Sequence, residues 1–416
     1  MTASTPISRR TMLTLLAGAG AAALAGCEPI RAAAPAVAVP DPLLVDVDGG
    51  VVVLRGAGRR TIPQAVATAD GLAVYATAPA GPDTAFWRVY TGAGGASPRV
   101  TLPGRWLPQA VSATGTLVAL TPERMAVTDG RPAGRELTRL LVADVTGVRQ
   151  RLELRGNFVP EAFTADLGGL FVLEWLPATA PDRYRVRVVD LATRAPGPLL
   201  TRDKSPVPPG AEEEMRGEGR QAVLAPDRTT LYTLYTHQPG HRHTRDLVSG
   251  RPGNAHAFVH TLDLAARWAY CIDLPHPFGE APVHSHAMAI SPDGGQLFVT
   301  DVTSGAVAEI STVDLAVVRT VNRAVGTGTA YAATDGRALF VGAGTAVRRI
   351  DLARLDAAAG WPVREPVTGL VSSADGSRLY VGQRDAVSWH DPATGRELGR
   401  VAVPGLVTVR GPAAPD

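Results

Sequence analysis

The stretch SPDGGQLFVTD at residues 291–301, with AVAEISTV at 306–313 and VVRTV at 317–321, decides the fold. Each apolar run is short, rich in β-branched residues and bounded by Gly, Asp, Ser or Pro, which is the pattern of strands joined by tight turns. Asp-Gly suits such a turn because Gly accepts a positive φ and Asp hydrogen-bonds within its own turn. We interpret the stretch as four short strands with turns between them.

The same sequence pattern recurs along the chain. Its turn recurs at Ala69-Asp70-Gly71, Ala113-Thr114-Gly115, Ala165-Asp166, Pro226-Asp227, Asp335-Gly336 and Asp375-Gly376. The strands that follow these turns lack a clean polar face, as expected for sheets that are covered on both sides. Repetition of a four-stranded unit is typical of propellers, whose blades stack around a central axis. We predict an all-β chain that forms a β-propeller of four-stranded blades.

The number of blades depends on the ends of the repeat region. Seven complete repeats can be counted, and residues 43–64 and 406–410 are left over. These leftover residues either complete the last blade or form an eighth blade divided between the two ends of the chain. Joining the ends in one blade avoids open sheet edges. We favour seven blades, with eight as the alternative.

Two of the repeats carry family motifs. The copy at 291–321 resembles the YVTN-type repeat of bacterial propellers, with Phe298-Val299-Thr300-Asp301 in place of the motif that names it. The last copy contains Trp389-His390-Asp391, which is similar to a WD-type strand ending. The resemblance implies a propeller over most of the chain, and it implies no particular activity.

The first residues follow a different pattern. Arg9 and Arg10 precede a stretch from Leu13 to Leu24 that is apolar and free of charge. A charged segment followed by an apolar segment of this length is typical of a signal peptide. The stretch is too short for a comfortable transmembrane helix, which needs roughly 20 strongly apolar residues.

Two export motifs coincide in this leader. The paired arginines resemble a twin-arginine signal, and Leu24-Ala25-Gly26-Cys27 resembles a bacterial lipobox. The resemblance implies that Cys27 is lipidated and holds the protein on the extracytoplasmic face of the cell membrane. The general secretory route is the alternative for export. We expect a signal peptide at 1–26, the lipidated Cys27 with an Ala- and Pro-rich tether at 27–42, and the propeller at 43–416.

Composition excludes several function classes. The chain is 45% hydrophobic and 19% charged, with 44 Gly and 34 Pro, which describes a soluble globular protein rich in turns. The net charge is +2 and no basic run is present, so we expect no nucleic-acid partner. With Cys27 lipidated, Cys271 has no partner for a disulfide, and we expect it to be a buried, inert thiol in an outer strand.

The longest irregular segments belong to two classes of connection. If strands a to d run outward from the axis, the b-to-c loops and the d-to-a connections emerge on the same face. Loops held by a rigid scaffold usually carry binding residues, so we expect function on this face. The segments are 122–135 and 236–255 between strands b and c, and 201–219 and 274–285 between strands d and a.

Histidines gather on these connections. Eight of the nine lie between residues 237 and 286, and the spacings His241-x-His243 and His284-x-His286 each put two imidazoles on one side of an extended chain. Imidazole is the commonest metal ligand, so a divalent metal ion is a candidate cofactor. Its candidate ligands are His237, His241, His243, His256, His284 and His286.

The alternative for these residues is a polar loop without an ion. The spacing matches no closed zinc signature, and His260 and His276 are interpreted as ordinary hydrogen-bonded side chains. We interpret the neighbouring Glu212-Glu213-Glu214 as a solvated charge run, with cation binding as the second interpretation.

The sequence lacks the usual enzymatic signatures. It has no Gly-x-Ser-x-Gly, no phosphate-binding Gly-rich loop and no His-Glu-x-x-His. The leading hypothesis is a non-enzymatic, membrane-anchored propeller that binds a protein, a glycan or a small ligand through its loop-rich face. The alternative is a metal-dependent enzyme resembling propeller lactonases or streptogramin-type lyases, with histidines of that face holding the ion. A third, weaker hypothesis is an assembly factor of the cell envelope.

Overall fold

The computed structural model describes residues 37–92, 94–122, 127–128, 130–253, 255–322 and 326–413. Arg9, Arg10, Cys27, the signal peptide and most of the tether lie outside these residues, so the export and lipidation motifs stay predictions. The first strand begins at Val39, inside the range expected for the tether. No helix in the described ranges is long and apolar enough to cross a membrane.

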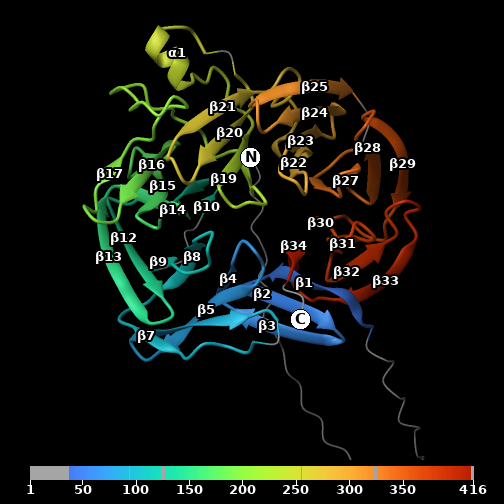
Figure 1. Cartoon of the computed structure of the whole chain (residues 1–416), viewed down its shortest axis with the longest axis horizontal. Helices are drawn as coiled ribbons and strands as arrows, with labels where there is room; N and C mark the ends of the chain where they lie inside the picture. Colours follow the sequence, from blue (N-terminus) through green and yellow to red (C-terminus); the bar gives the residue numbers. More distant parts are fainter. Residues whose placement is uncertain are drawn as a thin grey trace, which may run out of the picture. The chain divides into compact units, whose positions relative to one another are not determined.

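Within the described residues, the strands form eight four-stranded antiparallel sheets that follow one another around a ring (Figure 1). From the axis outward, the first four are β34 (Leu406–Pro412), β1 (Val39–Val47), β2 (Gly50–Gly56) and β3 (Gly58–Pro63); β4 (Ala65–Ala67), β5 (Ala73–Ala80), β6 (Asp83–Tyr90) and β7 (Val100–Leu102); β8 (Leu107–Val111), β9 (Val118–Thr121), β12 (Leu137–Asp144) and β13 (Gly147–Arg155); and β14 (Asn157–Phe163), β15 (Gly169–Leu176), β16 (Arg183–Asp190) and β17 (Pro196–Gly197).

The other four continue in the same way. They are β18 (Gln221–Leu224), β19 (Thr230–Tyr235), β20 (Phe258–Asp263) and β21 (Ala269–Asp273); β22 (His286–Ile290), β23 (Gln296–Asp301), β24 (Ala306–Ser311) and β25 (Ala316–Asn322); β26 (Ala330–Thr334), β27 (Ala338–Ala343), β28 (Ala346–Asp351) and β29 (Asp356–Pro362); and β30 (Gly369–Ser372), β31 (Leu379–Gln383), β32 (Ala386–His390) and β33 (Glu397–Ala402). A two-stranded ribbon, β10 (Val127–Thr128) and β11 (Arg131–Pro132), lies in the connection between β9 and β12.

The all-β propeller of four-stranded blades is confirmed, and the preference for seven blades is wrong. The leftover residues form an eighth blade, in which β34 from the end of the chain pairs with β1 from its beginning. Val45 lies opposite Val409 in this pair, and both side chains are buried. The physical reason is that β1 would otherwise present an unpaired edge at the axis, and only the C-terminal strand can cover it.

The turn that defines the repeat has a constant hydrogen-bond pattern. In blade β22–β25, the Ser291 hydroxyl donates to Asp293 Oδ1 (2.5 Å), which also accepts the Gly295 N–H (3.0 Å). Gly294 has a φ of 77°, as Asp-Gly predicted. The same Ser/Thr-to-Asp bond recurs in three other blades, at Thr68 and Asp70, at Thr164 and Asp166, and at Ser373 and Asp375.

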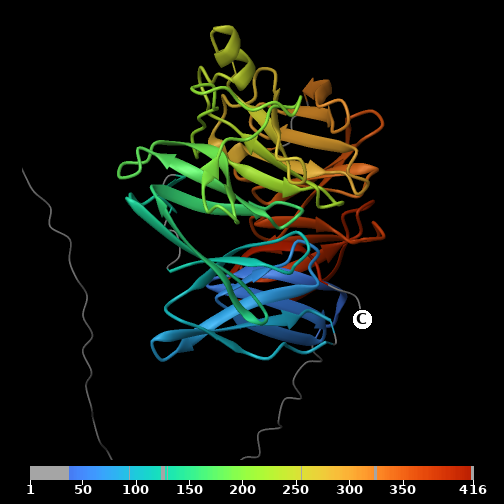
Figure 2. The ribbon, with the colours of Figure 1, turned by 60° about the vertical axis from the view of Figure 1, so that its left-hand side comes forward.

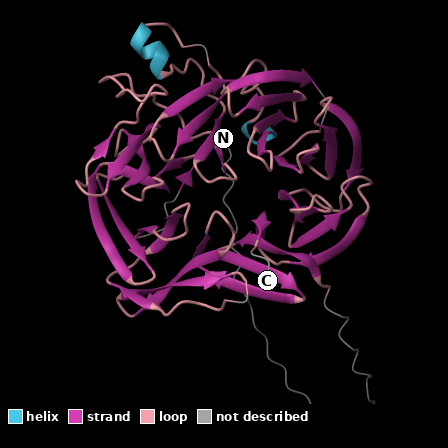
Figure 3. Ribbon diagram, viewed as in Figure 1, coloured by secondary structure: helices cyan, strands magenta, loops and turns pink. Residues whose placement is uncertain are grey.

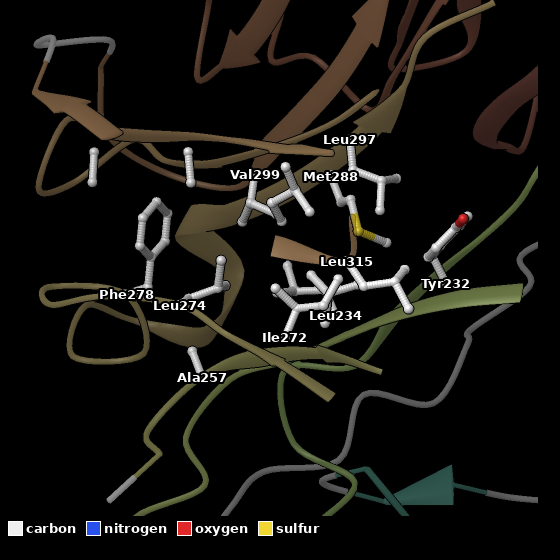
Figure 4. Close-up of a cluster of buried hydrophobic side chains, with 14 of the residues drawn as sticks. Tyr232, Leu234, Ala257, Ile272, Leu274, Phe278, Met288, Leu297, Val299 and Leu315 are labelled. Carbon is white, nitrogen blue, oxygen red and sulfur yellow. The ribbon is translucent and has the colours of Figure 1, made fainter. Parts of the chain in front are cut away.

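The core lies between neighbouring blades. Figure 4 shows Leu234 and Ile272 of blade β18–β21 facing Met288 and Val299 of blade β22–β25, and all four side chains are buried. Each sheet therefore has two covered faces, which explains why its strands lack a polar side. A buried side chain of this size contributes about 1.5–3 kcal/mol to stability.

The long connections lie where the sequence predicted them. Segments between β9 and β12 and between β19 and β20 join second to third strands, while those between β17 and β18 and between β21 and β22 join one blade to the next. They carry the short helices α1 (Thr244–Ser249) and η1 (Val283–Ser285), which stand out among strands in Figure 3. In Figures 1 and 2, α1 stands at the edge of blade β18–β21.

Candidate metal centre

Two long connections meet beside blade β18–β21. Glu213 lies between β17 and β18, and His241 and His243 lie between β19 and β20. One ligand atom from each residue lies within 4.8 Å of the other two. Both histidines are buried, and the Glu213 side chain is 16% exposed. We call these three residues the metal triad.

The Glu213 carboxylate is the centre of the triad. Its Oε1 accepts the backbone N–H of Thr244 (2.8 Å), which fixes the orientation of the carboxylate. Its Oε2 lies 3.3 Å from His241 Nε2 and 3.2 Å from His243 Nδ1, and the thiol of Cys271 donates to it at 3.0 Å. Burial alone would raise the pKa of Glu213, but the hydrogen bonds from the two histidines outweigh it and hold the pKa well below its usual range. Glu213 is therefore an ionised carboxylate.

His243 lies between two carboxylates. Its Nδ1 faces Glu213, and its Nε2 lies 2.5 Å from Asp273 Oδ1. Asp273 is itself held by Arg245, whose Nη2 donates to Oδ2 at 2.5 Å. Burial lowers the pKa of His243, but the contacts with Asp273 and Glu213 outweigh it and raise the pKa to about 9. With a carboxylate at each nitrogen, the ring carries its positive charge at neutral pH.

Local structure positions the two imidazoles. His243 precedes α1, and its backbone N–H donates to the Asp246 side chain (3.1 Å), which anchors the start of the helix. Phe258 stacks against the ring of His241, with centroids 4.5 Å apart, and meets the ring of His243 edge-on at 5.0 Å. The two imidazoles have centroids 4.7 Å apart. The prediction that His241 and His243 share one side of the chain is confirmed.

Two other predicted ligands form a separate pair that does not include the metal triad. His237 and His286 lie with centroids 6.1 Å apart. His286 is fully buried, and its Nε2 accepts the backbone N–H of Gly279 (3.1 Å). Burial lowers the pKa of His286. Within the described residues, this pair has no third ligand close enough to complete a metal group.

The remaining predicted ligands lie apart from the triad. His284 is exposed and belongs to η1, so the extended geometry expected for His284 and His286 is not found. His256 lies near His276, with centroids 5.3 Å apart. The structure thus brings together two of the six candidate histidines with Glu213, for which cation binding was only the second interpretation.

The interpretation of residues 212–214 as a solvated charge run is wrong for its middle member. Glu212 pairs with Arg185 (3.0 Å) and Glu214 pairs with Arg183 (2.6 Å), whereas Glu213 points to the histidines. Alternation along an extended segment separates the middle side chain from its neighbours. That alternation, on a connection adjacent to the histidine-rich loop, is the signal that could have identified Glu213.

Cys271 and Asp273 also belong to the site, although the sequence predicted neither of them as a site residue. Both lie on the outer strand β21. The prediction that Cys271 is buried is confirmed, and burial together with the Glu213 charge raises the pKa of its thiol well above the usual value. Two residues further along β21, Asp273 reaches the same group of side chains from the end of the strand.

The donor set has a definite chemistry. Two imidazole nitrogens and one carboxylate oxygen are ligands of zinc and of other late first-row metals, whereas calcium and magnesium prefer oxygen ligands alone. The contact between His243 Nε2 and Asp273 is the carboxylate–histidine arrangement that orients metal-bound imidazoles. The triad can therefore bind a divalent cation through His243 Nδ1, with Asp273 fixing the ring.

Comparison with known proteins supports the fold and leaves the activity open. No protein-family model matches the chain, and no curated protein matches it in sequence. The structure of apo AztD from Citrobacter koseri is similar, with a TM-score of 0.51 and 12% identity over 88% of this chain and 96% of that one. A second AztD structure from the same organism gives 0.51 and 11% over 90% and 98%.

The dihydro-heme d1 dehydrogenase NirN, in complex with DHE, is also similar. Its TM-score is 0.50, with 12% identity over 91% of this chain and 76% of that one. At this level of identity the likeness concerns the fold alone, which is that of a β-propeller.

Proposed function

We propose that this protein is a binding propeller, anchored to the outer side of the cell membrane through Cys27, that holds a divalent transition metal ion, preferably zinc, on its loop-bearing face. The observation that carries the proposal is the metal triad, in which three ligand atoms from two connections lie within 4.8 Å of one another. The anchor rests on the arginine pair and the lipobox of the leader.

Zinc is preferred because of the ligand types and the geometry. Nitrogen ligands favour late first-row metals over calcium and magnesium. Three protein ligands leave one position of a tetrahedral ion open, and the Cys271 thiol, 3.0 Å from Glu213 Oε2, is the nearest soft group that could approach it. Binding would replace the proton on His243 Nδ1 and leave the contact with Asp273 intact.

A metal-dependent enzyme is the second candidate, because an open position on a three-ligand ion is also the arrangement of catalytic zinc. Such an enzyme needs a base beside the ion. Among the described residues around the triad, Glu212 is paired with Arg185 and Arg187, and Asp273 is paired with Arg245. These ion pairs favour binding over catalysis. Metal-dependent turnover of a lactone or a cyclic peptide would reverse this preference.

Titration of the purified, metal-free protein with zinc chloride tests the proposal. We expect one zinc ion per chain by calorimetry and by elemental analysis. Glu213→Gln, His241→Ala and His243→Ala should each weaken binding by about a hundredfold or more, because each removes one of three ligands.

The matched controls are Glu214→Gln, His256→Ala and His284→Ala, which change neighbouring or similar residues outside the triad and should leave the affinity unchanged. Failure of the unaltered protein to bind zinc would contradict the metal site. Loss of binding in the His284→Ala variant alone would instead move the site to the other histidines.

The anchor has its own test. Replacement of Cys27 by Ser should move the protein from the membrane fraction to the soluble extracytoplasmic fraction and abolish incorporation of radiolabelled palmitate. Membrane association that persists in this variant would contradict lipid anchoring without affecting the metal site.

A further inference from the structure

A cavity of about 470 Å³ lies between blade β14–β17 and blade β18–β21, bordered by α1. Cavities of this size commonly hold small organic molecules. Part of its wall is apolar, and it is formed by Val186, Leu199, Met215, Val248 and Ala269. Val248 is a largely exposed valine on α1, which places an apolar side chain at the edge of the opening.

His260 is the unexplained polar group of this cavity. It lines the cavity and is only 4% exposed. Within the described part of the chain, no hydrogen-bond partner contacts its ring nitrogens. Buried polar groups almost always have such a partner, so this imidazole is left for a group that enters the cavity. A neutral imidazole offers one N–H donor and one acceptor nitrogen, which suits a hydroxyl or a carbonyl.

A positive charge is available elsewhere on the wall. Arg202 and Arg245 both line the cavity, and their guanidinium carbons lie 5.1 Å and 5.7 Å from the centroid of the Tyr270 ring. Arg245 is neutralised by Asp273. No carboxylate among the described residues lies within 4.0 Å of the Arg202 guanidinium, so this group can pair with an anion.

We propose that this cavity is a binding site for a small organic acid with an apolar body, in which His260 hydrogen-bonds to a hydroxyl or oxo group and Arg202 pairs with the carboxylate. The apolar wall accounts for the body of the ligand, the unpartnered imidazole for its polar group, and the free guanidinium for its acid group. Glu213 and His243 also line this cavity, so the acid would lie beside the metal triad. Its binding does not depend on the ion.

Three related probes separate these contributions. Para-hydroxyphenylacetate carries both polar groups, phenylacetate lacks the hydroxyl and para-cresol lacks the acid. Their affinities are measured by calorimetry on the full-length protein in excess chelator, so that failure of the metal site leaves this test intact. We expect para-hydroxyphenylacetate to bind about tenfold more tightly than either of the other two, because each lost polar contact is worth about a factor of ten.

Variants assign each contact to its residue. Arg202→Gln should reduce the advantage of para-hydroxyphenylacetate over para-cresol to near unity, and its exposed position makes the fold insensitive to the change. His260→Leu should remove the advantage over phenylacetate, with circular dichroism confirming the fold. Arg396→Gln, which changes an exposed arginine of another blade, is the matched control and should bind like the unaltered protein.

Three outcomes would overturn the proposal. The first is that none of the probes binds at millimolar concentration. The second is that all three bind with equal affinity, and the third is that the preferences survive in both variants. Either of the last two would show that His260 and Arg202 do not contact the ligand.

Discussion

Blades β18–β21 and β22–β25 are neighbours with the same strand order, and they share one buried cluster of side chains. They differ in their connections. In blade β22–β25 the second and third strands are joined by residues 302–305, whereas in blade β18–β21 the same connection runs from 236 to 257 and contains α1. The longer connection supplies His241 and His243.

The opposite ends of the two blades are alike. The turn between the first two strands uses Asp293 in one blade and Asp227 in the other, and each aspartate accepts a backbone N–H two residues later at 3.0 Å. The comparison teaches that one side of the propeller is specified by repeated turns, while the other side is free to vary. The candidate metal ligands lie where a long connection interrupts the repeat.

The largest expected effect is on the stability of the propeller, from a substitution on β34 where the ring of blades closes. Val409 on β34 is 4% exposed and packs in a cluster with Val45, Tyr380 and Trp389. Val409→Asp would bury an unpaired charge, and we expect a loss of about 4 kcal/mol or more in the free energy of unfolding, measured by urea denaturation.

Val407 on the same strand is 50% exposed, so Val407→Asp is the matched control and should cost less than about 1 kcal/mol. Equal losses in the two variants would mean that β34 does not close the ring as described.

The second effect is on the pH dependence of stability, and it concerns only blade β18–β21, where the long connection carries His243. The pKa of His243 is raised from 6.5 to about 9 in the folded protein. A group with a raised pKa contributes its stability fully below its unfolded value and loses it as the pH rises through the folded value. In the metal-free protein, we expect the free energy of unfolding to fall by about 3 kcal/mol as the pH rises from 6.5 to above 9.

His243→Gln should flatten this dependence, because it removes the imidazole whose pKa is raised in the folded protein. A variant with the same slope as the unaltered protein would assign the pH dependence to another group.

The third effect sharpens the role of β21 in the metal centre. Asp273 contacts His243 Nε2 and would not itself bind the ion. Asp273→Asn should weaken zinc binding about tenfold to a hundredfold, because loss of such a partner reduces control of the imidazole orientation. Asp263→Asn, at the end of the neighbouring strand β20 and outside the triad, is the control. An unchanged affinity in Asp273→Asn would show that the ring is held by Phe258 and Glu213 alone.

The smallest effect concerns one difference between the two turns, the residue two positions before the aspartate. Ser291 donates to Asp293, whereas Ala225 occupies the equivalent place before Asp227. Ser291→Ala should lower the free energy of unfolding by about 1 kcal/mol, and Ala225→Ser should raise it by roughly a few tenths of a kcal/mol, both measured by thermal unfolding. Losses of equal size in both variants would mean that the two turns are not equivalent.

The fold could be predicted because its signals are local. Asp293-Gly294 and its repeats act within a few residues, and so does the alternation of the strands that follow them. The blade count was not determined locally, because Val45 and Val409 meet only when the ring closes. Residues 43–64 and 406–410 fit either a completed last blade or an eighth blade, and only the pairing of β1 with β34 decides between the two.

Only part of the site could be predicted from the sequence, because some of its residues meet only in the folded chain. The spacing of His241 and His243 marks a metal-binding pair within one loop, and the structure brings both to one carboxylate. Glu213 and Asp273 come from a different connection and a different strand, and their nearness depends on how two blades pack. His284 had the same spacing as the pair, but a turn of 3-10 helix separates it from His286.

The position of β34 has a consequence for the order of folding. During synthesis, β1, β2 and β3 emerge first, while the strand that covers the inner edge of β1 emerges last. The nascent chain therefore carries an open edge until β34 has been synthesised, and an open edge is a template for pairing with other chains. We therefore expect β34 to pair with β1 only after the strands of the other blades have been synthesised, and a chain that stops before Leu406 to keep that edge open.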